Sequence, residues 1–294
     1  MSVLSSSLCT SRPHFSHRPS SCSSSSSCSI SWLSFSSSNS FSFLRIQFSV
    51  PATSCFLGRP SIRVSNVCTH QQTIPVDKSK LRVSEGTSEA ELWAAACLRV
   101  RTFNKFRPNS YGIEDHKKYL AEHEYEAIKE RTAGKRVGFK RVSCINATLP
   151  LAEISTLADD LCATCKFSDN GEDRIVVGTL DLNQCMRLPD EITGMKPEGI
   201  GADFARAYLS NVCVAKELHR NGLGYALVAK AKTIAEDWGI SDLYVHVAFD
   251  NEPAKNLYLK SGFVYESDEP AWQARFLDRP RRILLWTALS ELLL

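Results

Sequence analysis

The stretch that decides the fold is RAYLSNVCVAKELHRNGLGYALVAKAKTIAEDWGISDLYVHVAFDNEPAKNLYLKSGF, residues 206 to 263. It contains an apolar strand pattern, a turn with Gly222 and Gly224, a long amphipathic helix, a second strand and a short helix that ends at Gly262. Sites for phosphate binding and for proton transfer can both be placed within it.

The turn HRNGLG, residues 219–224, leads from a loop into a helix. Its two glycines leave the backbone open to a ligand, and the first N–H groups of a helix lack partners and lie at the positive end of its dipole. This pattern is typical of a phosphate site, and a helix start without any ligand is the alternative. A dinucleotide fingerprint would need a third glycine where Leu227 stands, and a P-loop would need Gly-Lys-Ser/Thr, so both nucleotide interpretations are weakened.

The elements after the turn have clear periodicities. Apolar residues recur at spacings of three and four from Leu223 to Trp238, and Gly239 follows as a natural stop, so one face of this helix should pack on a sheet. From Leu243 to Val247 apolar residues alternate with Tyr and His, which predicts a strand with two different faces. Pro253 suits the first turn of the short helix and Gly262 its end.

Three motifs in this stretch resemble those of the GCN5-related N-acetyltransferases, or GNAT proteins. They are VCV at 212–214, HRNGLG at 219–224 and N-x-x-A-x-x-L-Y-x-K-x-G-F at 251–263. The turn of that family usually opens with Gln or Arg, whereas His219 stands here, which leaves one pyrophosphate contact to Arg220. The resemblance implies an α/β (α+β) fold, in which a mixed central sheet with splayed central strands is flanked by helices.

The same resemblance implies a site for acetyl-CoA and no metal. In GNAT enzymes the pantetheine arm lies along the first splayed strand, the pyrophosphate lies on the amides of the turn, and a segment after the second strand lines the other side. The corresponding residues are Val212, Cys213, Val214, His219, Arg220, Asn221, Gly222, Leu223, Gly224, Tyr225, Asn251, Glu252, Pro253 and Tyr258.

Three residues are candidates for proton transfer. Tyr258 matches the tyrosine beside the CoA sulfur that protonates the departing thiolate in this family, and a plain core aromatic is the alternative. His246 and Tyr208 stand at the offsets of a histidine and a tyrosine that position a water in some N-terminal acetyltransferases of the family, the branch acting on Met-starting chains. Other GNAT enzymes carry a glutamate at the position of Tyr208, and strand histidines are commonly structural. The sequence therefore does not decide which residue is the general base.

The acceptor chemistry explains why such a pair would suffice. An amine attacks a thioester only when neutral, and α-amino groups have a pKa near ~7.8 against ~10.4 for lysine. At about pH 8 an N-terminus is mostly reactive, whereas deprotonating a lysine costs roughly 3 kcal/mol at ~1.4 kcal/mol per pKa unit. A neutral histidine can accept the proton through water. We expect direct attack by the amine, since no Ser or Cys has the adjacent base that a nucleophile requires.

Residues 1–76 have the composition of an organelle transit peptide. They contain no Asp or Glu, are rich in serine, and carry only five arginines as fixed charges. Serine richness with few arginines favours the chloroplast over the mitochondrion, and a disordered regulatory tail, the alternative, would be expected to contain acids. We therefore expect residues 1–68 to be a disordered plastid transit peptide, cleaved between about Arg59 and Thr69, and residues 79–290 to form a GNAT domain in the stroma.

Charge and cysteine content narrow the function classes. The five leader arginines exceed the formal net charge of +3, so the remainder is mildly acidic, which argues against nucleic acid as the main partner. The roughly 220 remaining residues suffice for one domain. The cysteines outside the leader are scattered, as in a reducing compartment, except for a CxxC at Cys162 and Cys165, and a zinc site would need a second such pair. No apolar run is long enough for a membrane span.

Outside the central stretch, local patterns predict further elements. A short strand at Leu81–Val83 precedes a helix that Ser88 and Glu91 begin as a capping box. A charged helix at Glu114–Arg131 ends at Gly134. Strands are expected at Val142–Leu151, Arg174–Leu182, Val264–Glu266 and Arg282–Ala288. Loops are expected at Phe106–Tyr111, 152–173, Pro189–Gly201 and Ser267–Pro280, with the first and last at the acceptor side of a GNAT fold.

From these features we expect a plastid protein N-acetyltransferase that transfers acetyl from acetyl-CoA to N-terminal α-amino groups and to protein lysines. Its resemblance to plastid GNAT enzymes of plants, some with both activities, is the reason to name both acceptors. The alternative enzyme is a small-amine N-acetyltransferase, for example one acting on an arylalkylamine, which needs a closed apolar pocket where a peptide needs an open groove. The alternative outside catalysis is a CoA-binding regulatory protein, and the presence of Tyr258 argues against it.

Overall fold

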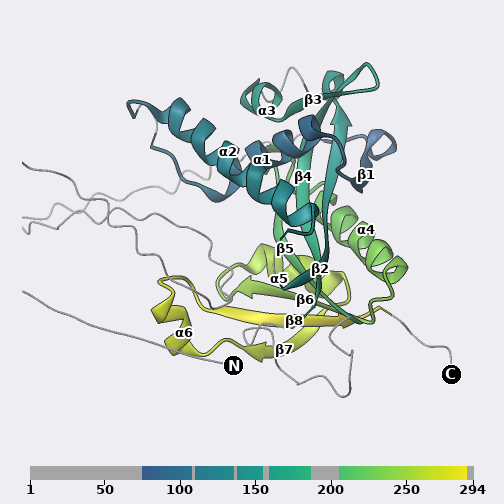
Figure 1. Ribbon diagram of the computed structural model, residues 1–294, viewed down its shortest axis with the longest axis vertical. Helices are drawn as coiled ribbons and strands as arrows, with labels where there is room; N and C mark the ends of the chain where they lie inside the picture. The colour runs from purple at the N-terminus through teal and green to yellow at the C-terminus, as the bar shows by residue number, and fades with distance from the viewer. Residues whose placement is uncertain (1–74, 108–109, 136–137, 155–158, 187–204, 290–294) are drawn as a thin grey trace, which may run out of the picture. The chain divides into compact units, whose positions relative to one another are not determined.

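The computed structural model describes residues 75–107, 110–135, 138–154, 159–186 and 205–289, all within the unit Asn39–Leu294 (Figure 1). In chain order its elements are η1 (Lys78–Lys80), β1 (Arg82–Glu85), α1 (Glu89–Phe103), α2 (Ile113–Thr132), β2 (Phe139–Pro150), η2 (Leu151–Glu153), α3 (Asp159–Thr164), β3 (Lys166–Asp169), β4 (Glu172–Cys185), β5 (Arg206–Val214), η4 (Lys216–Leu218), α4 (Leu223–Asp237), β6 (Asp242–Ala248), α5 (Glu252–Lys260), β7 (Val264–Asp268), α6 (Ala271–Phe276) and β8 (Arg282–Ala288).

The described strands form one mixed sheet. Its order is β1-β2-β4-β5-β6-β8-β7, and β3 pairs with β4 outside this path. Neighbouring strands are antiparallel except for β5 and β6, which run parallel. The crossover between β5 and β6 is made by α4, as a parallel pair requires.

The parallel pair is held together at one end only. Arg206–Leu209 of β5 pairs with Asp242–Val245 of β6, and the register between the two strands goes no further. Strand β5 continues to Val214 alongside β4, and β6 continues to Ala248 alongside β8. The central strands therefore splay apart, and the expected mixed sheet with splayed central strands flanked by helices is confirmed.

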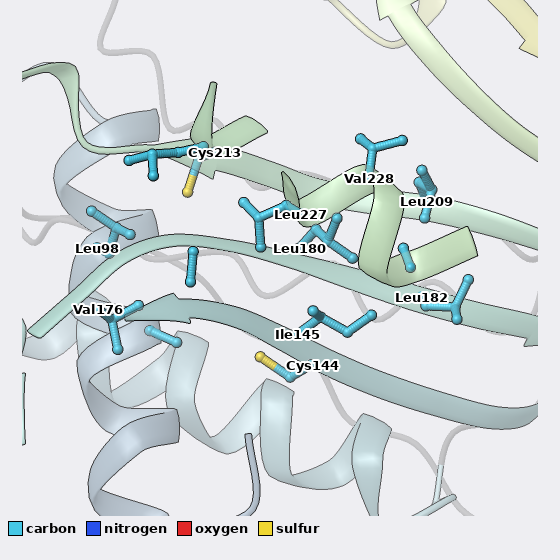
Figure 2. Packing of buried hydrophobic residues seen from close by; sticks show 14 of the residues in the cluster. Leu98, Cys144, Ile145, Val176, Leu180, Leu182, Leu209, Cys213, Leu227 and Val228 are labelled. Atoms are coloured by element: carbon cyan, nitrogen blue, oxygen red, sulfur yellow. The ribbon is translucent and has the colours of Figure 1, made fainter. Parts of the chain in front are cut away.

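Helices cover both faces of this sheet. On one face Arg99 of α1 reaches Asp181 of β4, and α2 packs beside α1. On the other face Leu227 of α4 packs over Gly178 of β4, where an added Cβ would lie only 2.9 Å from the leucine Cδ1. Figure 2 shows buried side chains that join these layers, among them Leu98, Ile145, Leu180, Leu182, Leu209 and Val228.

Capping residues explain where several helices begin and end. Ser88 Oγ accepts a hydrogen bond from the Glu91 N–H at the start of α1, and Asn251 Oδ1 accepts one from the Ala254 N–H at the start of α5. Gly239 follows α4 with a φ of 73°, in the region that favours glycine. These are the signals that the sequence shows, so the helix boundaries agree closely with those expected.

The sequence predicts the connections less well. The region 152–173, expected to be a loop, contains α3 and β3, and β3 joins β4 through a turn at Asn170 and Gly171. The expected loop Ser267–Pro280 contains α6. These elements have six, four and six residues, too few for an apolar period to mark them.

Further expectations concern the first strand and two connections. The first strand is Arg82–Glu85 instead of Leu81–Val83. The expected loop Pro189–Gly201 lies outside the described residues, and so does residue pair 108–109 of the connection expected at Phe106–Tyr111.

Leu98→Ala should lower the free energy of unfolding by about 2–5 kcal/mol, because this fully buried leucine of α1 would leave a cavity against the sheet. Leu259→Ala is the matched control, since Leu259 of α5 is 53% exposed, and it should change the same quantity by less than about 0.5 kcal/mol. Urea unfolding of both variants measures the difference, and equal losses would contradict the core position of Leu98.

Candidate active site

Strand β5 carries one extra residue opposite β4 at the point where it leaves β6. Asp181 of β4 stands opposite Ser210, but Thr179, two residues along β4, stands opposite Cys213, three residues along β5. The bulge includes Asn211, whose φ of 54° lies in the left-handed region that side chains other than glycine seldom adopt. Pairing with β6 stops one residue before Ser210, so the bulge begins where the central strands separate.

Beyond the bulge, the backbone of Val214 faces away from β4. Val214 stands opposite Gly178, and the N–H of Ala215 donates to Val177 O at 2.8 Å. Hydrogen-bonded and non-hydrogen-bonded pairs alternate in an antiparallel ladder, so the N–H and C=O of Val214 itself point to the side of β5 that β6 has left. We call this edge the open side of β5.

This alternation divides the three residues expected to pair with a pantetheine arm. Cys213 stands opposite Thr179, so its backbone groups face β4, and its side chain is buried in the core (Figure 2). The expectation that the Cys213 backbone pairs with a pantetheine arm is therefore corrected, because its N–H and C=O face β4 and pair there. Val212 lies within the bulge with a half-buried side chain, and Val214 presents its backbone to the open side.

His219 contacts this same edge. Its Nε2 lies 3.1 Å from Val214 O and must donate, since a carbonyl oxygen can only accept. This hydrogen bond ties the turn to β5, and it directs the imidazole to a backbone carbonyl instead of to the phosphate site expected at the turn. A ligand amide that bonds to Val214 O would replace this donor.

The turn before α4 leaves the start of that helix open. Gly222 is the N-cap residue with a φ of 80°, and no side chain caps the first N–H groups. Arg220 is exposed, and its guanidinium has no partner among the residues that the structure describes. Asn221 holds the turn instead, because its Nδ2 donates to Leu218 O at 3.1 Å. A helix N-terminus and an unengaged guanidinium are thus together at this turn, a combination that suits an anion.

The two glycines of the turn have different roles. Gly222 has the positive φ that glycine adopts easily. A Cβ on Gly224 would lie 3.1 Å from Leu257 Cδ2, so the absence of a side chain lets α4 and α5 approach each other. A Cβ on Gly222 would meet only Lys78 Nζ, so of the two glycines Gly222 has the more accessible backbone. Next to them, Leu223 is buried and Tyr225 is exposed.

A cation that sequence reasoning missed lies beside this turn. Lys78 Nζ is 3.7 Å from the position that a Cβ on Gly222 would take. The neighbouring Val76 N–H donates to Asn221 Oδ1 at 3.2 Å, a contact between residues 145 positions apart. No local pattern marks Lys78, because only the folded chain brings it to the turn.

Tyr208 and His246 meet across the two central strands. Tyr208 Oη lies 3.0 Å from His246 Nδ1. Tyr208 stands opposite Tyr244 in the parallel register, so His246, two residues further along β6, shares its face of the sheet and lies just beyond the last pair of β5 and β6. Tyr208 and His246 were both predicted from their offsets to the family motifs, and the structure places them in contact.

Tyr258 reaches the same region from α5. Its side chain is in the core, with 4% of its surface exposed, and its ring lies edge-on to Phe263 at 5.4 Å between centroids. Burial raises the pKa of the Tyr258 phenol well above its usual value, and the nearby Tyr208 raises it further. No described residue makes a hydrogen bond to the hydroxyl. Tyr258 is thus a core residue that keeps its proton at neutral pH and has an unpaired hydroxyl close to Tyr208.

The segment Asn251–Pro253 forms the start of α5. Asn251 uses its side chain as the helix cap, and Glu252 forms an ion pair with Lys255. All three residues of the segment are exposed. The polar side-chain atoms of Asn251 and Glu252 are already used within α5, so the segment would contact a ligand mainly through its exposed surface.

A buried carboxylate lies under the bulge. Asp181 Oδ1 accepts from Arg99 Nη2 at 2.6 Å, and its Oδ2 accepts from Asn211 Nδ2 at 2.7 Å. Arg131 Nη2 of α2 lies 3.2 Å from the same Oδ2. Burial alone would raise the pKa of Asp181, but the guanidiniums of Arg99 and Arg131 hold it below its usual value. Sequence reasoning missed this network because its members lie in four separate elements.

The CxxC does not pair its sulfurs. Cys162 and Cys165 are free thiols, and burial raises the pKa of Cys165 to about 12. Among the described residues, no group of three or more His, Cys, Asp or Glu side chains could hold a metal ion. The described helices also include none with the length and apolarity needed to cross a membrane.

Comparison with known proteins gives a family match and close relatives. The family profile described as "Acetyltransferase (GNAT) family" matches residues 146–263. The chain is 65% identical over 231 residues to GCN5-related N-acetyltransferase 7, chloroplastic, of Arabidopsis thaliana, which covers 79% of this chain and 83% of that protein. It is 29% identical over 195 residues to GCN5-related N-acetyltransferase 6, chloroplastic, of the same plant, over 63% of this chain and 62% of the relative.

Solved structures resemble the chain more distantly. The PaiA N-acetyltransferase from Thermoplasma acidophilum, in complex with coenzyme A, matches 71% of this chain and 98% of its own at 13% identity, with a TM-score of 0.42.

Proposed function

We propose, from the premise that this chain belongs to the GCN5-related N-acetyltransferase family, that it transfers acetyl from acetyl-CoA to protein amines by direct attack. N-terminal α-amino groups are the leading acceptors and lysine ε-amino groups the second. The observation that carries this proposal is the contact between Tyr208 of β5 and His246 of β6 at the point where the two central strands separate, with the buried Tyr258 of α5 near enough to Tyr208 to feel it electrostatically.

The chain's own donors and acceptors suit acetyl-CoA. Val214 offers an N–H and a C=O on the open side of β5, which can pair with a peptide-like arm as an added strand would. At the turn, the N-terminus of α4 with Arg220 and Lys78 offers positive charge for a diphosphate. When bound, acetyl-CoA supplies an acetyl group activated by its bond to sulfur.

His246 and Tyr208 would act on the acceptor amine. The hydroxyl of Tyr208 can donate or accept, so the bond to His246 Nδ1 fixes the imidazole in either tautomer. A ring held in this way can orient a water that takes the proton from the amine. This task is light for an N-terminus, whose pKa near ~7.8 leaves it mostly neutral at about pH 8, and heavier for lysine at ~10.4.

Tyr258 would act on the departing sulfur. In water a phenol, pKa ~10, is a weaker acid than a thiol, pKa ~8.5, so donation to a solvated thiolate would be unfavourable. Burial raises the pKa of a thiol as it raises that of the Tyr258 phenol, so within the site the donation depends on the sulfur being desolvated more strongly than the phenol.

The leader supports a chloroplast location, in the stroma. Residues 1–68 have no acidic residue and are rich in serine, which suits a plastid transit peptide, and residues 79–290 would form the catalytic domain. That the relative sharing 65% identity is called chloroplastic supports the same location.

Tyr258→Phe should lower kcat for a peptide N-terminus about 10²-fold, because the proton donor to sulfur is lost while the ring still fills the core. The dissociation constant for acetyl-CoA should change less than about threefold. Tyr265→Phe, at a tyrosine that is 58% exposed, is the matched control and should leave kcat unchanged. Mass spectrometry of peptides with free or blocked N-termini separates α-amino from lysine transfer.

Two outcomes of that assay would contradict the proposal. Tight acetyl-CoA binding with no transfer to any amine would favour a CoA-binding regulatory protein. Transfer to an arylalkylamine but to no peptide would favour a small-amine acetyltransferase.

His246→Ala should lower kcat at pH 7 by about tenfold or more, and the deficit should shrink toward pH 9, where an α-amino group is already neutral. Acetyl-CoA affinity should be little changed, since His246 lies in β6 and contacts Tyr208 of β5. His123→Ala, at an exposed histidine of α2, is the control. Equal losses of kcat and of acetyl-CoA affinity, or a deficit independent of pH, would remove His246 from the base role.

A further inference from the structure

We propose that Asn211 and Asp181 are positioning residues for acetyl-CoA binding: the buried carboxylate holds Asn211 in its left-handed conformation and so keeps β5 bulged away from β6. The inference rests on the proposed function, because it concerns how the open side of β5 is made available to that ligand. It assigns a role to two residues that touch neither the acetyl group nor the amine.

The first step is the conformation of Asn211. Left-handed backbone is unfavourable for a residue with a side chain, and asparagine tolerates it best when its amide finds a local partner. Here that partner is Asp181 Oδ2, at 2.7 Å from Asn211 Nδ2. The bond reaches from the bulge to the strand that the bulge opposes, so it stabilises the bulged register over a continuous ladder.

The second step is the rigidity of the carboxylate. Arg99 and Asp181 are each 1% exposed, and Arg99 donates to both carboxylate oxygens, at 2.6 and 3.1 Å. Arg131 Nη2 lies 3.2 Å from Oδ2. Arg99 of α1 and Arg131 of α2 both hold the carboxylate of Asp181. The carboxylate therefore cannot move with Asn211 into a β5 strand without the bulge. The carboxylate is therefore a fixed point to which β5 is attached.

The third step is the effect of the bulge on the strand pair. Without the extra residue, β5 could continue its parallel register with β6 past Leu209. The alternation along β5 would then shift by one residue, so the N–H and C=O of Val214 would turn toward β4 and leave the open side without them. Removing the support of Asn211 should therefore reduce the population of open strand pairs and weaken acetyl-CoA binding, while the chemistry at Tyr258 is left intact.

The test uses the purified full chain and isothermal titration with acetyl-CoA. Asn211→Ala should raise the dissociation constant about tenfold, the order expected when alanine must adopt left-handed backbone. Asn211→Gly should bind within about threefold of wild type, since glycine adopts that conformation freely. The KM for acetyl-CoA should rise in Asn211→Ala while kcat and the KM for peptide change little.

Asn170→Ala is the matched control for a general loss of stability. Asn170 is also an asparagine with left-handed backbone, φ 50°, but it lies in the turn between β3 and β4. This variant should lower the melting temperature without changing the dissociation constant for acetyl-CoA.

The role of Asp181 is tested by a double-mutant cycle. Asp181→Asn should weaken acetyl-CoA binding in the wild-type background and have little further effect beside Asn211→Gly, because glycine no longer needs the carboxylate. Asp181→Asn disturbs a buried ion pair and can fail to fold. In that case the acetyl-CoA dissociation constants of the Asn211 variants alone test the proposal.

Two results are distinguishable as failures. A folded Asn211→Ala variant that binds acetyl-CoA as tightly as wild type would overturn this inference and leave the proposed function in place. A wild-type chain that does not bind acetyl-CoA at all would overturn the proposed function and this inference with it.

Discussion

One buried carboxylate connects the parts of the molecule that make the site. Asp181 lies in β4, inside the sheet. Its carboxylate accepts hydrogen bonds from Arg99 of α1 and Asn211 of β5 and forms an ion pair with Arg131 of α2. Charges held out of water are costly unless fully paired, and this carboxylate is fully paired. The bulge in β5 is therefore anchored in the core of the fold, whereas bulges are over-represented at sheet edges.

The proposed function follows from the edge of β5 that the bulge turns away from β4. Strands β5 and β6 each keep one full neighbour, β4 and β8, so their separation disturbs the sheet only along their shared edge. On that edge the Val214 N–H needs a partner and the Val214 C=O is bonded by the exposed His219, so a ligand with peptide-like amides can supply the first partner and replace the second. The same separation allows Tyr258 to lie near the Tyr208–His246 pair, which itself bridges the two strands at the point of divergence. In the proposed function, cofactor binding and proton transfer thus share one structural cause.

The sequence predicts what depends on local pattern. The helix from Leu223 and the strand through Val245 are long and periodic, so their positions agree with the structure. Elements of four to six residues, such as β3 and α6, have no period to detect. Tyr208 and His246 could be paired only through family offsets, because 38 positions separate them along the chain. The backbone orientation of Cys213 was missed because it depends on the bulge, and a bulge is not visible in residue types.

A second class of error came from residues whose type fits two roles. Glycine permits either close approach of a ligand or close approach of another helix, and at Gly224 only the packed position of Leu257 shows that the second applies. His219 could bind an anion or a carbonyl, and the fold directs it to Val214 O. Lys78 has no local context at all, because its position at the turn depends on contacts made across the chain. Such roles are decided by tertiary distances.

The most direct test of the central claim is residue-resolved amide hydrogen exchange along β5, with and without acetyl-CoA. If the ligand lies against the open side of β5, the Val214 amide should exchange much more slowly when acetyl-CoA is bound, while the Cys213 amide, already paired with β4, should be protected in both states. An unchanged Val214 amide in a chain saturated with acetyl-CoA would show that the ligand binds elsewhere.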